Sequence, residues 1–370
     1  MQRFALIGAG RIGALHAANL ASMPGARLAM VFDADRGAAE KVAEDYGAAT
    51  TVKVTVAAAA DDIFDANQND AVLIASPTAT HVDFTLRAAR AGQAVLCEKP
   101  VSLDTAEAAR AAAALAEIPG ARVQVGFNRR FDPGHAELAR RVAGGDIGRL
   151  EQLVITSRDP GLPSMDYLRG SGGIFRDMMI HDFDLARFVL SAAAGGDNAA
   201  GDGDTGDEAD EITTVTAAAT VQIDSRLRAI GDHDSAMATL TTAAGRLCHI
   251  SNSRRAVYGY DQRVEAFGAA GMLVSGNRTP TEVAVYNARA TAARPPLLHF
   301  FTERYAEAYR LQLAAFIEMV DAVEAAKVGR ANSKSPPSPS PSFEDGRRAL
   351  VLAAAAEESL RDARAVAVQF

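Results

Sequence analysis

The stretch "LIGAGRIGALHAANL" places Gly8, Gly10 and Gly13 between an apolar run and an Ala-rich run. This G-x-G-x-x-G spacing constrains the fold. The first glycine permits a tight turn after a strand, the second lets a ligand approach the backbone, and the third lets the next helix pack closely. Asp33 ends the following apolar run, "RLAMVFD", 20 residues after Gly13. The pattern predicts a strand–turn–helix–strand unit with an anion site at the helix N-terminus.

Short apolar runs alternate with helical runs over the first third of the chain. Alternation of this kind predicts a doubly wound parallel sheet with helices on both faces, hence a Rossmann α/β domain over 1–125. The expected strands cover 3–8, 27–32, 50–56, 71–75, 93–97 and 122–127, and the expected helices cover 11–22, 36–46, 57–65, 79–91 and 104–117.

The pattern changes near residue 125, where strand-like stretches lose their regular helical crossovers. This change predicts an α+β domain over 126–370, built on an open, largely antiparallel sheet. The length of 370 residues also exceeds what one core usually serves. The expected strands are 150–158, 212–224, 235–242, 246–253, 261–268 and 272–275, and the expected helices are 131–143, 174–190, 301–324 and 344–362.

Two segments of biased composition look like insertions. The segment 191–211 is rich in Gly, Ala and Asp, and the segment 331–342 is rich in Ser and Pro. Neither can bury enough apolar surface to offset its ordering entropy, so both are expected to be mobile surface loops. The Ser-Pro pairs of the second segment would also suit phosphorylation.

Charge and cysteine content restrict the classes of partner. The formal net charge is −8, but seven acids between 197 and 211 account for all but −1 of it. A nearly neutral body argues against nucleic acid and membrane surfaces, and leaves a small molecule as the expected partner. Cys97 and Cys248 are the only cysteines, which predicts a reducing, cytoplasmic location. We expect no signal peptide, no membrane span and no metal, because no cluster has metal-ligand spacing.

The acid at the end of the second strand indicates which dinucleotide would bind. Asp33 can accept hydrogen bonds from a ribose 2′-hydroxyl and would repel a 2′-phosphate, so NAD is favoured over NADP. Arg36 stands close enough in the sequence to meet a phosphate, which keeps NADP open. Arg11 and Ile12, inside the glycine motif, are expected to contact the same cofactor.

The segment "LIASPTATH" ends another expected strand of the parallel sheet. Ligands of such sheets bind beyond the carboxyl ends of the strands. Ser76, Pro77, Thr78 and His81 are therefore expected beside the nicotinamide ribose. A capping or solvated role is the alternative for His81.

Two further segments carry groups suited to proton transfer. In "VLCEKP", Pro100 forces Lys99 into an extended conformation and makes a cis peptide possible. Lys99 should point toward the ligand, unless it forms a surface ion pair with Glu98. In "SGGIFRDMMIHDFD", Asp177 and His181 stand four apart and share one helical face. Their alternative is a buried ion pair.

These segments resemble the glucose–fructose oxidoreductase / inositol dehydrogenase family, and within it the bacterial inositol 2-dehydrogenases. The resemblance covers nearly the whole chain except the two insertions. It rests on "GAGRIG", "ASPTATH", "EKP", "GFNRRFDP", "ITSRDP", "GGIFRDMMIHDFD" and "SRRAVYGYDQR".

The resemblance implies a site and a reaction. Lys99, Asp177 and His181 would be catalytic, and Glu98 would lie at the cofactor. Oxidation of a secondary alcohol needs a base for the proton and an acceptor for the hydride; a neutral imidazole suits the first task and NAD the second. His181 is expected to be the base, although Lys99 could share that role. The implied substrate contacts are Asn128, Arg129, Asp159 and Tyr260.

The expected function is therefore NAD-dependent oxidation of myo-inositol to scyllo-inosose. A dehydrogenase of another cyclic polyol or aldose is the alternative within enzymes, and a non-catalytic NAD-binding regulator is the alternative outside them. Because the family assembles through its open sheet, a homotetramer or dimer is implied.

Overall fold

The protein, seen here as a computed structural model, is described over residues 1–200, 210–327 and 340–370. Its internal contacts divide it into two compact units. Unit 1 comprises Met1–Phe131 and Ala308–Leu350, and unit 2 comprises Asp132–Glu307 and Val351–Phe370. The segment Ala308–Leu350, which the sequence analysis grouped with the second domain, belongs to unit 1.

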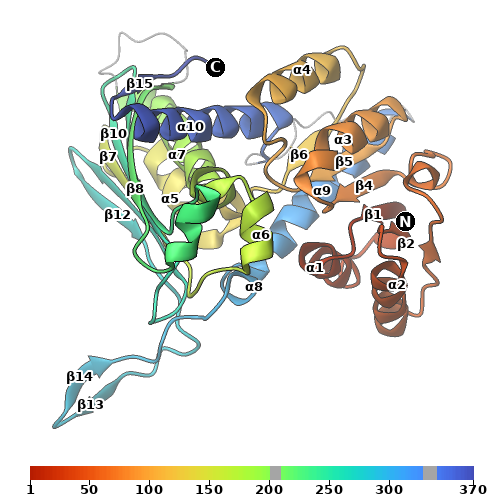
Figure 1. Ribbon diagram of the computed structural model, residues 1–370, viewed down its shortest axis with the longest axis horizontal. Helices are drawn as coiled ribbons and strands as arrows, with labels where there is room; N and C mark the ends of the chain where they lie inside the picture. The colour runs from red at the N-terminus through yellow and green to blue at the C-terminus, as the bar shows by residue number, and fades with distance from the viewer. Residues whose placement is uncertain (201–209, 328–339) are drawn as a thin grey trace. The chain divides into compact units, whose positions relative to one another are not determined.

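Unit 1 is built on a parallel sheet with the strand order β3-β2-β1-β4-β5-β6 (Figure 1). The order reverses between β1 and β4, which is where ligands of doubly wound sheets bind. The expected Rossmann architecture is confirmed. The strands are β1 (Gln2–Ile7), β2 (Ala26–Phe32), β3 (Thr55–Val56), β4 (Ala71–Ile74), β5 (Ala94–Cys97) and β6 (Val123–Val125). The helices between them are α1 (Arg11–Leu20), α2 (Arg36–Thr50), α3 (His81–Arg90) and α4 (Thr105–Ala116), with 3₁₀ turns at Ala60–Ile63, Thr78–Thr80 and Asn128–Phe131.

Both faces of this sheet are buried. Successive side chains of a strand point to opposite sides, and those of β1 belong to two separate hydrophobic clusters. On one face, Phe4 and Leu6 of β1 pack with Leu313 and Phe316 of helix α9 (Ala306–Lys327). The Phe4 and Phe316 rings meet edge to face with centroids 5.9 Å apart. Helix α9, from the C-terminal part of the chain, therefore completes the core of unit 1.

Unit 2 contains a mixed sheet with the strand order β12-β11-β7-β10-β9-β8-β15. Its neighbours are antiparallel except β7 and β10, which run parallel, so the largely antiparallel sheet is confirmed. The strands are β7 (Leu150–Arg158), β8 (Ile212–Thr220), β9 (Ser235–Thr242), β10 (Leu247–Ser253), β11 (Asp261–Gly268), β12 (Gly271–Ser275) and β15 (Val366–Ala367).

Helices α5 (Pro133–Ala143) and α7 (Ile180–Ala200) contact the strands of this sheet. The opposite face is open, with Met237, Phe267 and Val274 exposed. The remaining helices are α6 (Met165–Gly170), α8 (Phe301–Arg304) and α10 (Phe343–Asp362), which contributes to both units, with a 3₁₀ turn at Ser225–Ile230. A separate hairpin of β13 (Val285–Asn287) and β14 (Ala290–Ala293) projects from unit 2 (Figure 1).

Four local expectations were wrong. Helix α2 continues to Thr50 and ends at Thr51 in the left-handed region, which leaves only Thr55–Val56 as a strand. The helix expected at 57–65 is a single 3₁₀ turn, because the Asp62 side chain accepts from the backbone N–H groups of Ala58 and Ala59. The helix expected at 301–324 is interrupted at Tyr305.

The fourth error concerns the expected loops. Helix α7 runs on through Ala200, so the first half of the loop expected at 191–211 is helical. Residues 201–209 and 331–339 lie outside the described residues. At the far end of the second expected loop, Ser342 forms a bridge with Gln124.

Candidate active site

The carboxyl ends of the unit 1 strands meet at one edge, because the strands are parallel. The loops that leave this edge contain residues expected at the cofactor, in catalysis and at the substrate. They are Gly8 after β1, Asp33 after β2, Ser76 after β4, Glu98 and Lys99 after β5, and Asn128 and Arg129 after β6. The sequence therefore placed these residues on one edge correctly.

The three glycines of the motif differ in their surroundings. A Cβ on Gly8 (φ +96°) would lie 2.4 Å from the carbonyl carbon of Ala75, and a Cβ on Gly13 would lie 1.8 Å from the Gly8 oxygen. A Cβ on Gly10 would meet nothing within 4 Å. Gly8 and Gly13 are thus required by internal packing, whereas Gly10 borders open space.

That open space lies at the start of helix α1. Gly10 is the N-cap, no side chain caps this helix terminus, and no acidic residue stands in its first turn. A helix N-terminus without a cap offers N–H groups and partial positive charge to a phosphate. The residues present therefore fit a dinucleotide pyrophosphate, with Arg11 exposed beside it.

Asp33 is bound to the glycine loop. Its carboxylate accepts from the Ala9 N–H at 2.6 Å and from the Asp35 N–H at 2.8 Å. The side chain stays partly exposed, so it can still accept from a ribose. Arg36, which kept NADP open, pairs with Glu40 at 2.8 Å on the surface of α2. This arrangement favours a 2′-hydroxyl over a 2′-phosphate.

His81 does not stand where the sequence analysis expected it. Its side chain is 1% exposed. Nδ1 lies 2.8 Å from the Pro100 carbonyl oxygen, and Nε2 lies 2.9 Å from that of Ser76. The imidazole therefore links the loop that follows β4 to the loop that follows β5. Of its neighbours, Pro77 is exposed and Thr78 partly exposed.

Glu98 also faces inward. Its carboxylate pairs with Nε2 of the buried His16 at 2.7 Å. A Cβ on Gly126 would lie 2.5 Å from its Oε2, so the backbone after β6 packs directly on this group. Glu98 thus forms a buried pair with His16. Lys99 is partly exposed, and its bond to Pro100 is cis.

The second group of expected residues lies in unit 2, where β7 and β10 run parallel and end together. Asp159 follows β7 and Arg254 follows β10; the Asp159 N–H donates to the Ser253 carbonyl at 2.9 Å. Arg254 is fully buried, and its Nη1 donates to Asp177 at 3.0 Å. Asp232 lies 3.6 Å from the other Nη.

The Asp177 carboxylate is held from two sides. Besides the bond from Arg254, it accepts a hydrogen bond from the Tyr167 hydroxyl at 2.6 Å. Burial first, and then the Asp177 charge, raise the pKa of Tyr167, so this phenol remains a donor at neutral pH. Burial lowers the pKa of Arg254, but the Asp177 and Asp232 carboxylates more than offset that effect. Asp177 therefore sits in a fixed, charge-paired position.

The backbone that carries Asp177 is not a regular helix. The segment Phe175–Met179 is a π-helical turn, and α7 begins at Ile180 directly after it. Such turns occur frequently at functional sites. His181 follows in the first turn of α7 and is partly exposed. The expected regular helix over 174–190 is thus replaced at its start by a turn that carries Asp177, one of the three expected catalytic residues.

The expected substrate contacts separate into two kinds. Asn128 and Arg129 are 2% and 3% exposed in the turn after β6. Within the described residues, the Asn128 amide nitrogen has no hydrogen-bond partner, which suits a residue that awaits a ligand. Tyr260, in contrast, packs edge to face on Tyr305 with centroids 6.0 Å apart and is 6% exposed. Its ring is part of the buried core.

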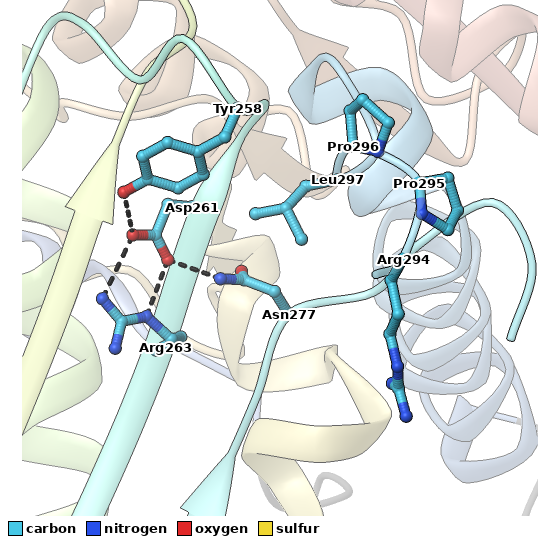
Figure 2. Close-up of a pocket in the computed structure, with 8 residues that line it drawn as sticks. All are labelled: Tyr258, Asp261, Arg263, Asn277, Arg294, Pro295, Pro296 and Leu297. Atoms are coloured by element: carbon cyan, nitrogen blue, oxygen red, sulfur yellow. Dashed lines mark hydrogen bonds and ion pairs between the residues drawn. The ribbon is translucent and has the colours of Figure 1, made fainter. Parts of the chain in front are cut away.

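A surface hollow of about 600 Å³ lies in unit 2 beside β11 (Figure 2). Figure 2 shows Asp261 between three lining side chains; it accepts from the Tyr258 hydroxyl at 2.7 Å, from Arg263 at 2.8 Å and from Asn277. The pKa of Asp261 is lowered because these bonds outweigh its burial. Three of the polar groups that line the hollow therefore already bind Asp261.

Sequence reasoning missed Arg254 and Tyr167. Arg254 lies inside the motif "SRRAVYGYDQR", but only the parallel pairing of β7 with β10 brings its strand end to Asp159. In the described part of the chain, no cluster of His, Cys, Asp or Glu is arranged to hold a metal ion. No helix among the same residues is long and apolar enough to cross a membrane.

The fold and the glycine loop define an oxidoreductase with a dinucleotide-binding domain, and family models agree. Residues 2–127 match the GFO/IDH/MocA oxidoreductase family with an NAD-binding Rossmann fold, and residues 135–274 match the GFO/IDH/MocA C-terminal domain. The chain belongs to this family, and NAD is its cofactor.

Its relatives narrow the class further. The chain is 42% identical to an inositol 2-dehydrogenase of Rhizobium meliloti, over 99% of both chains. It is 37% identical to a myo-inositol 2-dehydrogenase of Thermotoga maritima, over 99% of this chain and 98% of the relative. A solved myo-inositol dehydrogenase from Corynebacterium glutamicum superposes with a TM-score of 0.84 at 39% identity, covering 100% and 99% of the two chains. The chain is thus an oxidoreductase similar to inositol 2-dehydrogenases.

Proposed function

We propose that this enzyme oxidises the 2-hydroxyl of myo-inositol with NAD and yields scyllo-inosose. The observation that carries the proposal is Asp177, which lies in a π-helical turn four residues before His181 and accepts hydrogen bonds from Tyr167 and Arg254. The names of the relatives supply the substrate class: those at 42% and 37% identity are both inositol 2-dehydrogenases.

The proposed roles follow from the chemistry of the groups. When bound, NAD accepts the hydride from the carbinol carbon. His181 takes the hydroxyl proton, because a neutral imidazole can accept it near neutral pH. Asp177, which accepts a hydrogen bond from Arg254, orients the substrate or stabilises the imidazolium that forms. Lys99 donates a hydrogen bond to the reacting oxygen and stabilises the negative charge that develops on it.

The remaining contacts are proposed residue by residue. Unit 1 would hold the dinucleotide with Gly10, Arg11 and Asp33. Asn128 and Arg129, also in unit 1, and Asp159 in unit 2 are proposed to bind substrate hydroxyls. A polyol needs many such groups, since each buried hydroxyl must be satisfied.

The test is NAD reduction, followed by absorbance, with myo-inositol, scyllo-inositol and glucose, each with NAD and with NADP. Wild type is expected to turn over myo-inositol with NAD. The variants Lys99→Ala and His181→Ala should lose turnover while still binding NAD, and His299→Ala, at an exposed position, should behave as wild type. NAD binding without turnover of any polyol would overturn the proposal and favour the regulator.

A second substrate stays open on one specific ground. A scyllo-inositol 2-dehydrogenase (NAD(+)) of Bacillus subtilis is 34% identical over 86% of this chain. The two epimers differ in the orientation of one hydroxyl, so they should differ in kcat/KM and not only in KM. A higher kcat/KM with scyllo-inositol, or with an aldose, would reassign the substrate within the same reaction class.

The assembly and location of the enzyme are also proposals. The exposed Met237, Phe267 and Val274 on the open face of the unit 2 sheet favour a homotetramer or dimer formed through that face. Light scattering of wild type and of Phe267→Glu would test it, since the charge should dissociate the assembly. Cys97 and Cys248 are free and buried, which accords with the proposed cytoplasmic location.

A further inference from the structure

His81 is a buried titratable group that the proposed mechanism does not use. It begins helix α3, and both of its ring nitrogens face backbone carbonyl oxygens, of Pro100 at 2.8 Å and of Ser76 at 2.9 Å. These two carbonyls belong to the loops that leave β4 and β5, at the edge where the cofactor binds. One side chain thus bridges two loops of the active site.

The chemistry of imidazole limits how this bridge can be made. A neutral imidazole has one N–H donor and one acceptor nitrogen. Carbonyl oxygens only accept, so a neutral ring could satisfy one of the two contacts and would set its lone pair against the other oxygen. Only the imidazolium donates from both nitrogens. Two short contacts to oxygens that only accept are the contacts that a doubly protonated ring makes.

We propose that His81 is a positioning residue that works as an imidazolium, and that its two N–H groups fasten Ser76 to Pro100 and so fix the backbone beside Lys99. The proposal rests on the NAD-binding fold and on these two contacts, and is independent of which polyol the enzyme oxidises.

The surroundings of His81 accord with a charged ring. Burial lowers the pKa of His81, but Cys97 on β5 and the carbonyls of Pro100 and Ser76 more than offset this and raise it to about 9. The other ionisable groups nearby have their own partners. Glu98 pairs with His16, Glu107 of the adjacent α4 accepts from Ser102, and Asp83 of α3 faces Arg87.

The direction of the pH effect follows from that raised pKa. The stabilisation from the charged bridge is fully present below the unfolded-state value of about 6.5, and is lost as the pH rises through about 9. Loss of the proton should release one of the two loops, which would loosen the segment that carries Lys99.

The first experiment observes the ring itself. Two-bond ¹H–¹⁵N spectra of the ¹⁵N-histidine-labelled full-length protein, without substrate, report how many ring nitrogens carry a proton. The His81 signal is identified by its disappearance in His81→Gln. Two protonated nitrogens at pH 7.5 to 8, where an imidazole of ordinary pKa is mostly neutral, are the expected result. A singly protonated ring overturns the proposal, and this readout does not depend on turnover.

The second experiment measures kcat/KM for NAD between pH 7 and 10, in wild type, in His81→Gln and in the exposed control His299→Gln. Glutamine can donate to only one carbonyl in this geometry and does not titrate. We expect about a ten-fold lower kcat/KM at pH 7.5 in His81→Gln, and no fall near pH 9 beyond that set by the other groups. An unchanged wild-type pH profile in His81→Gln overturns the proposal. If that variant does not fold, the His81 signal of the wild type is assigned through the backbone resonances of residue 81, and its protonation state still decides.

Discussion

Substitution of Gly10 should separate cofactor binding from folding. A Cβ at this position meets nothing within 4 Å, and the backbone, at φ −70° and ψ −167°, is open to any L-residue. Gly10→Ala should therefore cost little. The reduced entropy of the unfolded chain contributes about 0.4–1 kcal/mol of stability. Replacing glycine by alanine at an N-cap costs up to about 1 kcal/mol. The two nearly cancel.

The same methyl group should obstruct the dinucleotide, because it occupies the space beside the helix N-terminus where a pyrophosphate must come close. Forcing one extra methyl into a packed contact costs about 1–3 kcal/mol. That corresponds to about a five-fold to 150-fold rise in the Kd for NAD. Calorimetry gives the Kd, and thermal unfolding without cofactor gives the stability.

Two comparisons make this prediction refutable. Gly13→Ala would place its Cβ 1.8 Å from the Gly8 oxygen, so it should lower Tm markedly even without NAD. Gly276→Ala, exposed and with nothing within 4 Å, should change neither quantity. If Gly10→Ala binds NAD as wild type does, the space beside Gly10 is not the pyrophosphate site. If it unfolds like Gly13→Ala, the packing argument is wrong.

The remaining predictions concern Arg254, Tyr167 and Asp132. Arg254→Met removes the buried cation of Asp177 and should destabilise the protein by about 3–5 kcal/mol in denaturant titration, with partial recovery on adding Asp177→Asn. Tyr167→Phe should keep Tm but lower kcat/KM about ten-fold, since it deletes one hydrogen bond to a carboxylate; an unchanged kcat/KM would exclude a functional role. Burial raises the pKa of Asp132, but neighbouring cations, Arg304 among them, lower it overall. Its contribution to stability should be present above about pH 4 and vanish as the pH falls through its lowered pKa, so Asp132→Asn should show a flatter acid limb in unfolding curves.

The parallel sheet was predictable because its signals are local. Each strand of unit 1 is an apolar run, and the glycine spacing fixes the first crossover. The return of Ala308–Leu350 to unit 1 was not predictable. The amphipathic pattern of α9 predicts that Leu313 and Phe316 are buried, but it does not predict which of the two sheets they pack against. The extension of α7 to Ala200 was missed for the opposite reason, since a Gly- and Asp-containing composition predicts a loop.

In the candidate site, the position of a residue was predictable from sequence, but the role of its side chain was not. A residue that follows a parallel strand lies at the ligand edge, and this rule placed Ser76 and Lys99 from sequence, whereas Asn128 came from the family resemblance. The direction in which a side chain points depends on partners distant in sequence. Asp177 is fixed by Arg254, 77 residues away, and the ring of His81 turns inward because the carbonyl of Pro100, 19 residues away, accepts from it. A polar residue at the edge can therefore touch the ligand or hold the loop that does. Only the hydrogen-bond partners of its polar atoms distinguish the two.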